Sequence, residues 1–548
     1  MKTKNVGHAI SRRDLIKIGS IGAIGTASIA LGGCGAPASS SVGKESSAKQ
    51  SLDGIPSFMN APDPIAEKDI VETKDYDVVV VGAGTAGVPA AISAHVNGAS
   101  VAVVQKESKP ISQGNTAAGI ALDKSDDAAI EWLIDSVLKE NQYRADREQM
   151  RTWARNSGEA LDFISEYGKD GEHPAALSIN DRYPDGYVAQ QYPGTNLKVT
   201  TFSMRCGVKP ICWQDGIESL AAIAAEDGVE FFYSTPAVQL VQSEEGSITG
   251  VICEGEKGYM QFNASKGVVL ATGDYQNDEE MVSYYLPDVS MLDKKQMNKT
   301  GDGHKMAMWV GGQMEPIGHT KMVHDFDATP MFNEPFLCVD LEGNRFCNEA
   351  IDMSLKNNFI LRNSHPGHYC QIFDSTYVDQ VKEWGGRPTD PEALRMYMPE
   401  EDVAERKGVR EDRIAVYKAD TIGELAEKLG IEDAAALEQT VEAYNALAQQ
   451  GADSNFGKEA KYVKSIVRPP FYGAHLQVRV SAITSGIVVD KDLRVLDGDG
   501  EPIKGLFAAG NTAGRFFGGV DYPLDIAGLS VGRAITGGYV AGKIAAQS

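Results

Sequence analysis

The chain has 548 residues, a formal net charge of −24 at pH 7 and 42% hydrophobic residues. This length fits roughly two or three domains, and the composition is ordinary for a soluble globular protein. An acidic surface repels the phosphate backbone, so the charge argues against a nucleic-acid partner. The seven cysteines include no Cys-x-x-Cys pair, so we expect no metal centre of the zinc or iron–sulfur kind and no c-type haem.

The first segment reads as an export signal rather than as part of the fold. A twin arginine at 12–13 precedes an apolar run over 18–31 that ends in Leu-Gly-Gly-Cys34. This resembles a twin-arginine signal closed by a lipoprotein cleavage box. We therefore assign residues 1–34 to the signal and 35–72 to a flexible tether rich in small residues. Lipid on Cys34 would hold the mature chain at the extracytoplasmic face of the cell membrane; an ordinary signal peptide cut nearby is the alternative.

A glycine-rich turn follows a buried strand. Residues 75–81 read as a strand, 88–97 as a helix and 100–104 as the next strand. A Gly-x-Gly-x-x-Gly turn in this context binds the pyrophosphate of a dinucleotide, because the backbone approaches the ligand and the helix N-terminus offers free N–H groups. The predicted contacts in this turn are Gly82, Ala83, Gly84, Ala86 and Gly87.

The second strand ends in Gln105 and Lys106, where an acidic residue usually holds the adenosine ribose. Gln105 can still form a hydrogen bond with a hydroxyl group, with less charge assistance. Three later segments favour FAD over a nicotinamide: a small-residue loop over 112–119, a strand over 267–275 and another over 505–511. Since a nicotinamide domain is normally complete within one domain length, segments so far apart suggest one ligand held by both ends of the chain.

From about residue 74 to its C-terminus the chain resembles the fumarate reductase and 3-ketosteroid dehydrogenase superfamily of flavoproteins. The motifs stand in the family's order: Asp75–Gly87, Gly114-Asn115-Thr116, Ala271-Thr272-Gly273, Thr300–Gly303, Gly343–Glu349, 421–447, Gly505–Gly510 and Thr536–Gly542.

The resemblance implies an α/β fold in which a split Rossmann-type FAD-binding domain, residues 73–290 and 466–548, carries an inserted α+β capping domain over 291–465. It also implies an FAD-dependent oxidoreductase acting on CH–CH bonds. The FAD contacts predicted beyond the glycine-rich turn and the second strand are Gly114, Asn115, Thr116, Ala118, Gly119, Val238, Thr272, Gly273, Asp302, Gly510, Asn511 and Leu529.

Catalytic residues separate the branches of this superfamily. Fumarate-type enzymes place an Arg proton donor shortly after their Arg-Phe-x-Asn-Glu motif, but here Met353 stands in that place, and a thioether cannot donate a proton. Their His before a Thr-Met-Gly-Gly turn is missing from 481–486, and their late Asn-Arg-x-Gly-Gly motif is missing from 518–528. These three departures argue against fumarate as the substrate.

The segment Tyr522-Pro523 looks closer to the ketosteroid dehydrogenase branch, where a Tyr hydroxyl and a Gly amide hold a ketone oxygen. Tyr522 O–H and Gly528 N–H are therefore the predicted donors, although the spacing to Ala527-Gly528 is longer here; a packed ring beside a turn-forming proline is the alternative for Tyr522. Arg345 reaches the site or forms a salt bridge within the cap. His319 and His324 lie near the place of a fumarate-type substrate His, or they are structural.

These residues predict reduction of an activated C=C bond, enone-like or acrylate-like, in a small organic molecule outside the cytoplasm. Charge that moves onto the conjugated group in such a reaction needs hydrogen-bond donors from the protein. Because the sequence shows no haem or FMN-binding domain, a separate electron-donor protein or carrier is expected. The alternatives are a ketosteroid-type dehydrogenase working oxidatively, a fumarate- or urocanate-type reductase, and a flavin-binding lipoprotein without catalysis.

Overall fold

The computed structural model describes residues 56–114, 116–170, 177–179, 187–206, 213–323, 329–406, 409, 411–519 and 526–548, with the backbone alone at 177–179, 187–190, 205, 206, 213 and 412. Four predicted functional residues lie outside the described residues: Cys34, Asn115, His324 and Tyr522. Within the described part of the chain, no helix has the length and apolar character needed to cross a membrane.

The largest sheet takes its strands from both ends of the chain. In sheet order they are β17 (Arg494–Leu496), β18 (Pro502–Ala508), β10 (Gly258–Leu270), β1 (Ile70–Val81), β2 (Val101–Val104) and β7 (Glu230–Phe232). The pairings from β18 through to β7 are parallel. Val78 to Val81 at the end of β1 are all buried, as expected for a parallel strand covered on both faces.

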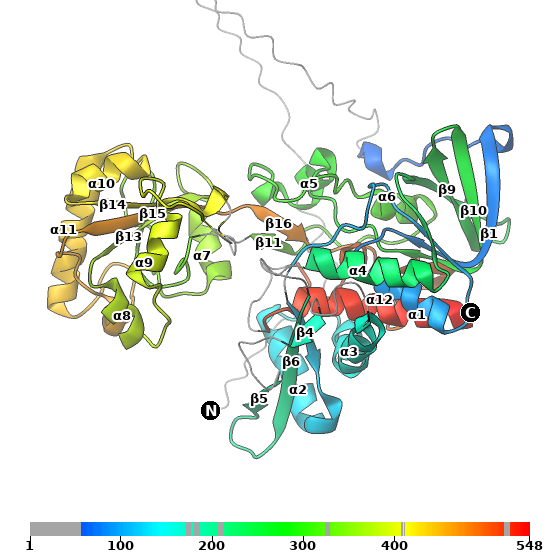
Figure 1. The fold of residues 1–548 in the computed structure, drawn as a ribbon, viewed down its shortest axis with the longest axis horizontal. Helices are drawn as coiled ribbons and strands as arrows, with labels where there is room; N and C mark the ends of the chain where they lie inside the picture. The colour runs from blue at the N-terminus through cyan, green and yellow to red at the C-terminus, as the bar shows by residue number, and fades with distance from the viewer. Residues whose placement is uncertain are drawn as a thin grey trace, which may run out of the picture. The chain divides into compact units, whose positions relative to one another are not determined.

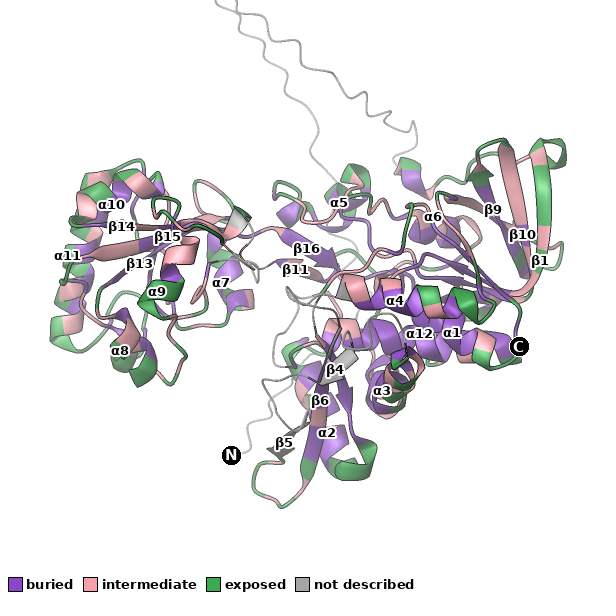
Figure 2. Ribbon diagram, in the orientation of Figure 1, coloured by how far each residue is buried: buried purple, intermediate pink, exposed green. Residues whose placement is uncertain are grey.

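An antiparallel extension adds β9 (Ile248–Gly255) to β10 and then β8 (Ala237–Gln242) to β9. Two helices pack together beside the parallel strands: α1 (Gly87–Val96) and α12 (Leu529–Gln547), drawn blue and red in Figure 1. A β-carbon at Gly538 would lie 2.0 Å from the Ala86 carbonyl oxygen, and one at Gly542 would lie 2.1 Å from that of Ala90. Glycine at these positions lets the C-terminal helix approach the first helix closely, and Figure 2 shows both helices largely buried.

A second sheet, which is antiparallel, begins after β2 in the chain. It consists of β3 (Ala117–Ile120), β6 (Lys198–Cys206), β4 (Leu177–Ile179) and β5 (Tyr187–Gln191), with β4 and β5 both paired to β6. The helices of this region are α2 (Asp127–Glu140), α3 (Arg147–Gly168) and α4 (Trp213–Glu226). Further along lie α5 (Glu279–Tyr285), α6 (Asp302–Trp309) and the strand pair β11 (Lys321–Val323) and β16 (Val480–Ile483).

The insertion carries its own antiparallel sheet, here called the cap sheet: β12 (Leu337–Val339), β13 (His368–Asp374), β15 (Phe471–Gln477) and β14 (Val416–Ala419). Its helices are α7 (Met353–Ile360), α8 (Tyr377–Glu383), α9 (Pro391–Leu394), α10 (Ile422–Leu429) and α11 (Ala434–Gln450). Strand β15 pairs with β13 and β14, so the cap sheet continues past the expected domain boundary at residue 465.

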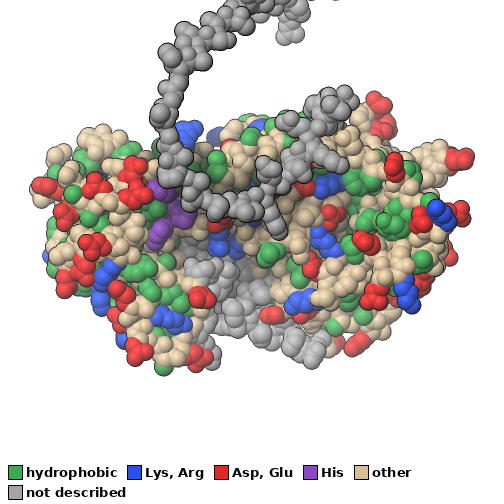
Figure 3. All heavy atoms as spheres, turned by 90° about the horizontal axis from the view of Figure 1, so that it is seen from above, with side chains coloured by type: hydrophobic (Ala, Val, Ile, Leu, Met, Phe, Trp, Pro, Cys, Tyr) green, Lys and Arg blue, Asp and Glu red, His purple; other side chains and the backbone are tan. Residues whose placement is uncertain are grey.

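These two architectures confirm the expected fold class, an α/β protein with a split Rossmann-type domain and an inserted α+β cap. The parallel strands come from β1, β2, β7, β10 and β18, and the cap sheet lies between β10 and β18 in the chain. Ligands in such open parallel sheets bind at the carboxyl ends of the strands. Figure 3 shows acidic side chains spread over the visible face with Lys and Arg among them, consistent with the net charge of −24.

Candidate active site

The glycine-rich turn joins the end of β1 to the start of α1 in a tightly packed arrangement. Gly82 has φ +103° and its N–H donates to the Val104 carbonyl oxygen at 2.8 Å. A β-carbon at Gly87 would lie 1.8 Å from the Gly82 carbonyl oxygen. The amides of Gly84, Thr85 and Ala86 find no acceptor within the described part of the chain. This helix N-terminus is therefore open to an anion, as a pyrophosphate requires.

The end of β2 braces that turn. Gln105 Oε1 accepts a hydrogen bond from the Ala83 N–H (3.2 Å), while its Nε2 donates to the Lys109 carbonyl (3.2 Å). Lys106 Nζ lies 2.9 Å from Asp302 Oδ2 and 2.8 Å from Thr300 Oγ1. The fold thus brings together Lys106 and Asp302, which the sequence predicted as FAD contacts from two distant motifs.

The carboxyl ends of β10 and β18 form the next part of the site. The Thr272 N–H donates to Thr512 Oγ1 at 3.0 Å, and Thr512 Oγ1 donates to the Gly273 carbonyl at 3.1 Å. A β-carbon at Gly510 would lie 2.9 Å from the Ala86 β-carbon, so the C-terminal segment meets the glycine-rich turn. His304 Nε2 lies 3.3 Å from the Asn511 carbonyl oxygen.

The loop before β3 meets the start of α12. Gly528 has φ +88° and directly precedes α12, and its carbonyl accepts a hydrogen bond from the Ala118 N–H at 2.9 Å. A β-carbon at Gly528 would lie 2.8 Å from the Thr116 carbonyl oxygen. The Gly528 amide has no acceptor among the described residues, so it is available to a ligand.

The other predicted FAD contacts lie on elements that flank these segments. Gly114, with φ +92°, precedes β3, and Leu529 is the first residue of α12. Val238 lies on β8, shortly after Thr235, whose N–H donates to the Gln105 carbonyl at 2.8 Å. Gly119 packs against α3, because a β-carbon there would lie 2.8 Å from Leu161 Cδ1. With its unpaired amides and close glycine contacts, the site fits a dinucleotide held by both ends of the chain.

A cavity of about 900 Å³ opens beside the cap. Its wall includes Arg144 after α2, Lys321 of β11, residues 349–358 around the start of α7, and Gly519. Gly519 directly precedes the segment that carries Tyr522. Met353, in the place of the fumarate-type proton donor, does line this cavity. The cavity therefore joins the segment where fumarate-type enzymes carry their proton donor to the residue that leads into the Tyr522 segment.

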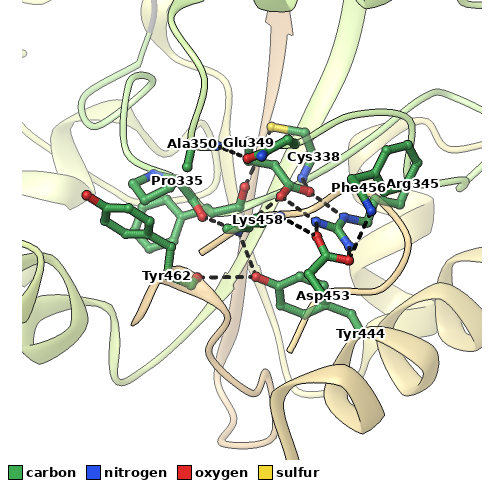
Figure 4. A network of polar contacts seen from close by, with 12 residues as sticks. Pro335, Cys338, Arg345, Glu349, Ala350, Tyr444, Asp453, Phe456, Lys458 and Tyr462 are labelled. Atoms are coloured by element: carbon green, nitrogen blue, oxygen red, sulfur yellow. Dashed lines mark hydrogen bonds and ion pairs between the residues drawn. The ribbon is translucent and has the colours of Figure 1, made fainter. Parts of the chain in front are cut away.

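Arg345 lies in a buried ion-pair network in the cap (Figure 4). Its guanidinium forms hydrogen bonds with Glu349 (2.8 and 2.9 Å) and with Asp453 (3.1 and 2.7 Å), and its side chain is 6% exposed. Glu349 also pairs with Lys458 at 3.0 Å, and Lys458 Nζ donates to the hydroxyl of Tyr444. Of the two roles that the sequence left open for Arg345, this geometry favours the salt bridge within the cap, since Arg345 is not part of the cavity wall.

The pKa values of this network follow from its charges. Burial raises the pKa of Asp453, but Arg345 and the amides of Lys458, Phe456 and Asn455 outweigh that effect and lower it to about 2. Burial lowers the pKa of the Lys458 ammonium, opposed by Glu349. The network holds two cations and two carboxylates, so its charges balance internally.

Comparison with known proteins identifies the family. A family profile described as an FAD binding domain matches residues 77–522. The chain belongs to this family. Vinyl phenol reductase of Lactiplantibacillus plantarum is 28% identical over 507 residues, covering 86% of this chain and 96% of the relative.

Two solved structures share the fold. A flavocytochrome c3 fumarate reductase in an open conformation has a TM-score of 0.65 at 25% identity, covering 87% of this chain and 79% of the other. The 3-ketosteroid-Δ4-(5α)-dehydrogenase of Rhodococcus jostii RHA1 has a TM-score of 0.63 at 23% identity, covering 88% and 100%. The protein is therefore an FAD-dependent oxidoreductase acting on CH–CH bonds, and FAD is its cofactor.

His319 is fully engaged within the flavoprotein's core. Its Nδ1 accepts from the Tyr275 hydroxyl and its Nε2 donates to the Glu315 carbonyl at 3.0 Å. Burial lowers the pKa of His319 to about 4, so the ring is neutral at pH 7. Both nitrogens are thus used inside the protein, which favours the structural interpretation of this histidine.

Lys356 is a cavity residue that the sequence reasoning passed over. It lies on α7 with Met353, Asn357 and Ile360, which are all buried. Residues at positions i, i+3 and i+7 of a helix share one face. Lys356 therefore shares the buried face of α7 with Met353 and Ile360, and a lysine at such a position could have been noticed in the sequence.

Proposed function

We propose that this flavoprotein reduces an activated C=C bond of a small organic molecule, and that the substrate binds in the 900 Å³ cavity beside α7. The observation that carries the proposal is the meeting, in one cavity, of residues 349–358 with Gly519, which leads into the Tyr522 segment. The bound flavin supplies a hydride, and a proton completes the saturated product.

The residues of the chain have two tasks in this reaction. First, they donate hydrogen bonds to the substrate oxygen that becomes negatively charged during hydride transfer. Second, they exclude a second anionic group from the place where fumarate-type enzymes bind one. The Tyr522 hydroxyl and the Gly528 amide are our candidates for the first task. The Gly528 amide suits it, since it has no acceptor among the described residues and lies at the positive N-terminus of α12.

One relative, vinyl phenol reductase, supports a reductase of a substrate other than fumarate, while other relatives are fumarate reductases. The match to vinyl phenol reductase extends over 96% of that relative's length. In addition, Met353 stands where the dicarboxylate enzymes carry their proton donor. The export signal and Cys34 support a lipid-anchored enzyme on the extracytoplasmic face, supplied with electrons by a separate protein or soluble carrier.

A stopped-flow screen tests the proposal. Flavin-loaded enzyme is reduced beforehand by a low-potential dye and mixed with enones, 2-enoates, steroids and dicarboxylates while flavin reoxidation is followed. We expect fast reoxidation by at least one enone or 2-enoate and slow reoxidation by fumarate. Fast response to fumarate alone would contradict the assignment.

A dehydrogenase working oxidatively is the second candidate, favoured by the Tyr522-Pro523 segment. It predicts the opposite direction: reduction of oxidised flavin by saturated ketones, with little reoxidation of reduced flavin by the corresponding enones. The same instrument and substrates distinguish the two directions.

A further inference from the structure

Lys356 is a buried cation without an ion-pair partner among the residues that the structure describes. The residue is 2% exposed and lies on the buried face of α7, where its backbone N–H donates to the Asp352 carbonyl at 2.9 Å. Its ammonium group forms no ion pair and no hydrogen bond with any residue that the structure describes. Lys356 also lines the 900 Å³ cavity.

Glu349, an acidic group of the same cavity wall, is already committed. Its two oxygens are shared between Arg345 and Lys458. Burial raises the pKa of the Cys338 thiol, but the hydrogen bond with Cys347 and the charge of Lys356 outweigh burial and lower that pKa. The Cys338 Sγ also lies 3.7 Å from the Phe336 carbonyl oxygen, and it forms no ion pair with Lys356. The network of Figure 4 is therefore closed, and the charge of Lys356 is uncompensated by it.

The other cations on the cavity wall differ from Lys356. Lys321 forms an ion pair with Asp288. Arg144 is exposed and donates to the carbonyls of Gly519 (2.9 Å) and Gly318 (3.3 Å). A buried ammonium without a partner is strongly unfavourable, so the occupant of the cavity is expected to bring an anionic oxygen to Lys356.

We propose that Lys356 binds the carboxylate of an acrylate-like substrate, a 2-enoate carrying one anionic group. This inference rests on the proposed function and narrows it. Met353 precedes Lys356 by three positions, so the two side chains share one face of α7. The thioether of Met353 suits an apolar part of the substrate, such as an aryl or alkyl group, and offers no site for a second carboxylate.

The reaction balances with Lys356 as a binding group. Hydride adds to the carbon β to the carboxylate, and the π electron pair moves toward the α-carbon and the carboxylate oxygens. Lys356 stabilises that extra negative charge. A proton from solvent then bonds to the α-carbon, giving the saturated acid. The hydride, with its two electrons, would come from FAD reduced by the external donor.

The test uses pairs of substrates that differ in charge. Cinnamate is compared with methyl cinnamate, and crotonate with crotonamide, on flavin-loaded wild type, Lys356→Met, Lys356→Arg and the control Lys428→Met, a cap lysine on α10 outside the cavity. Flavin content and circular dichroism are recorded for each variant. We expect wild type and Lys428→Met to prefer the carboxylates, and Lys356→Met to raise KM for the carboxylates by about ten- to hundredfold.

A readout without turnover separates binding from folding. Binding of 3-phenylpropanoate and 3-phenylpropanamide to the oxidised enzyme is measured by calorimetry. We expect Lys356→Met to weaken the acid selectively, and Lys356→Arg to restore part of its affinity. Equal loss for acid and amide, or a wild type that prefers the neutral partners, overturns the role of Lys356 while leaving alkene reduction intact. A wild type that reduces neither member of any pair but still reduces an enone of the stopped-flow screen overturns this inference alone. A wild type that reduces no alkene of that screen removes the proposed function, and this inference with it.

Discussion

Gly87→Ala should weaken FAD binding strongly through one contact. The added β-carbon would lie 1.8 Å from the Gly82 carbonyl oxygen, whereas contacts below 3.0 Å are essentially never found, so the two atoms must separate by at least about 1.2 Å. The turn cannot yield easily, because the Gly82 N–H is bound to the Val104 carbonyl at the end of β2. Overpacking of this kind costs about 1–3 kcal/mol, which corresponds to an increase of about 5- to 150-fold in the Kd for FAD if the strain falls on the binding turn.

The assay is a titration of apo-protein with FAD, followed by flavin fluorescence, together with thermal unfolding of the apo-protein. Gly498→Ala is the matched control, since a β-carbon at Gly498 meets no atom within 4 Å. We expect the control to bind FAD like the wild type. If Gly87→Ala binds FAD as tightly as Gly498→Ala, FAD binding does not depend on the close approach of Gly87 to the Gly82 carbonyl.

Four further predictions rest on individual contacts. Arg345→Met leaves Asp453 without its cation and Glu349 with Lys458 alone, and should destabilise the protein by about 3–5 kcal/mol in urea unfolding; an unchanged midpoint would contradict the network. Because the pKa of Asp453 falls from its ordinary 3.8 to about 2 on folding, its stabilising effect is complete above about pH 4 and is lost as the pH falls toward 2, and Asp453→Asn should flatten this acid dependence. Gln105→Leu leaves the buried Ala83 N–H unpaired and should weaken FAD binding about tenfold, whereas Gln105→Glu keeps an acceptor and should bind FAD near normally. Met353→Arg adds a cation beside Lys356 and should raise kcat/KM for fumarate relative to cinnamate by about tenfold; no change in this ratio would place Met353 away from the substrate.

Local sequence patterns were sufficient for the flavin half of the protein. The valine run before Gly82 predicts a buried parallel strand, and the glycine spacing predicts a turn at a helix N-terminus, because both depend on residues adjacent in the chain. The end of the cap was harder to place. Strand β15 (Phe471–Gln477) joins the cap sheet, but a strand pattern does not say which sheet it enters. The partners of His319 depend on long-range packing in the same way, and no spacing in the sequence reveals them.

The Arg-Phe-Cys-Asn-Glu motif shows why a conserved-looking signature can mislead a search for catalytic residues. Its Arg345 forms an ion pair with Asp453, and its Glu349 forms one with Lys458. These pairs hold the loop after α11 against the cap. This commitment gives the motif a function at the cavity nonetheless. By occupying both oxygens of Glu349, the network commits one of the carboxylates of this wall, so Glu349 is not available to Lys356. In the proposed role of Lys356, the motif therefore affects the choice of substrate anion through residues that do not touch the substrate.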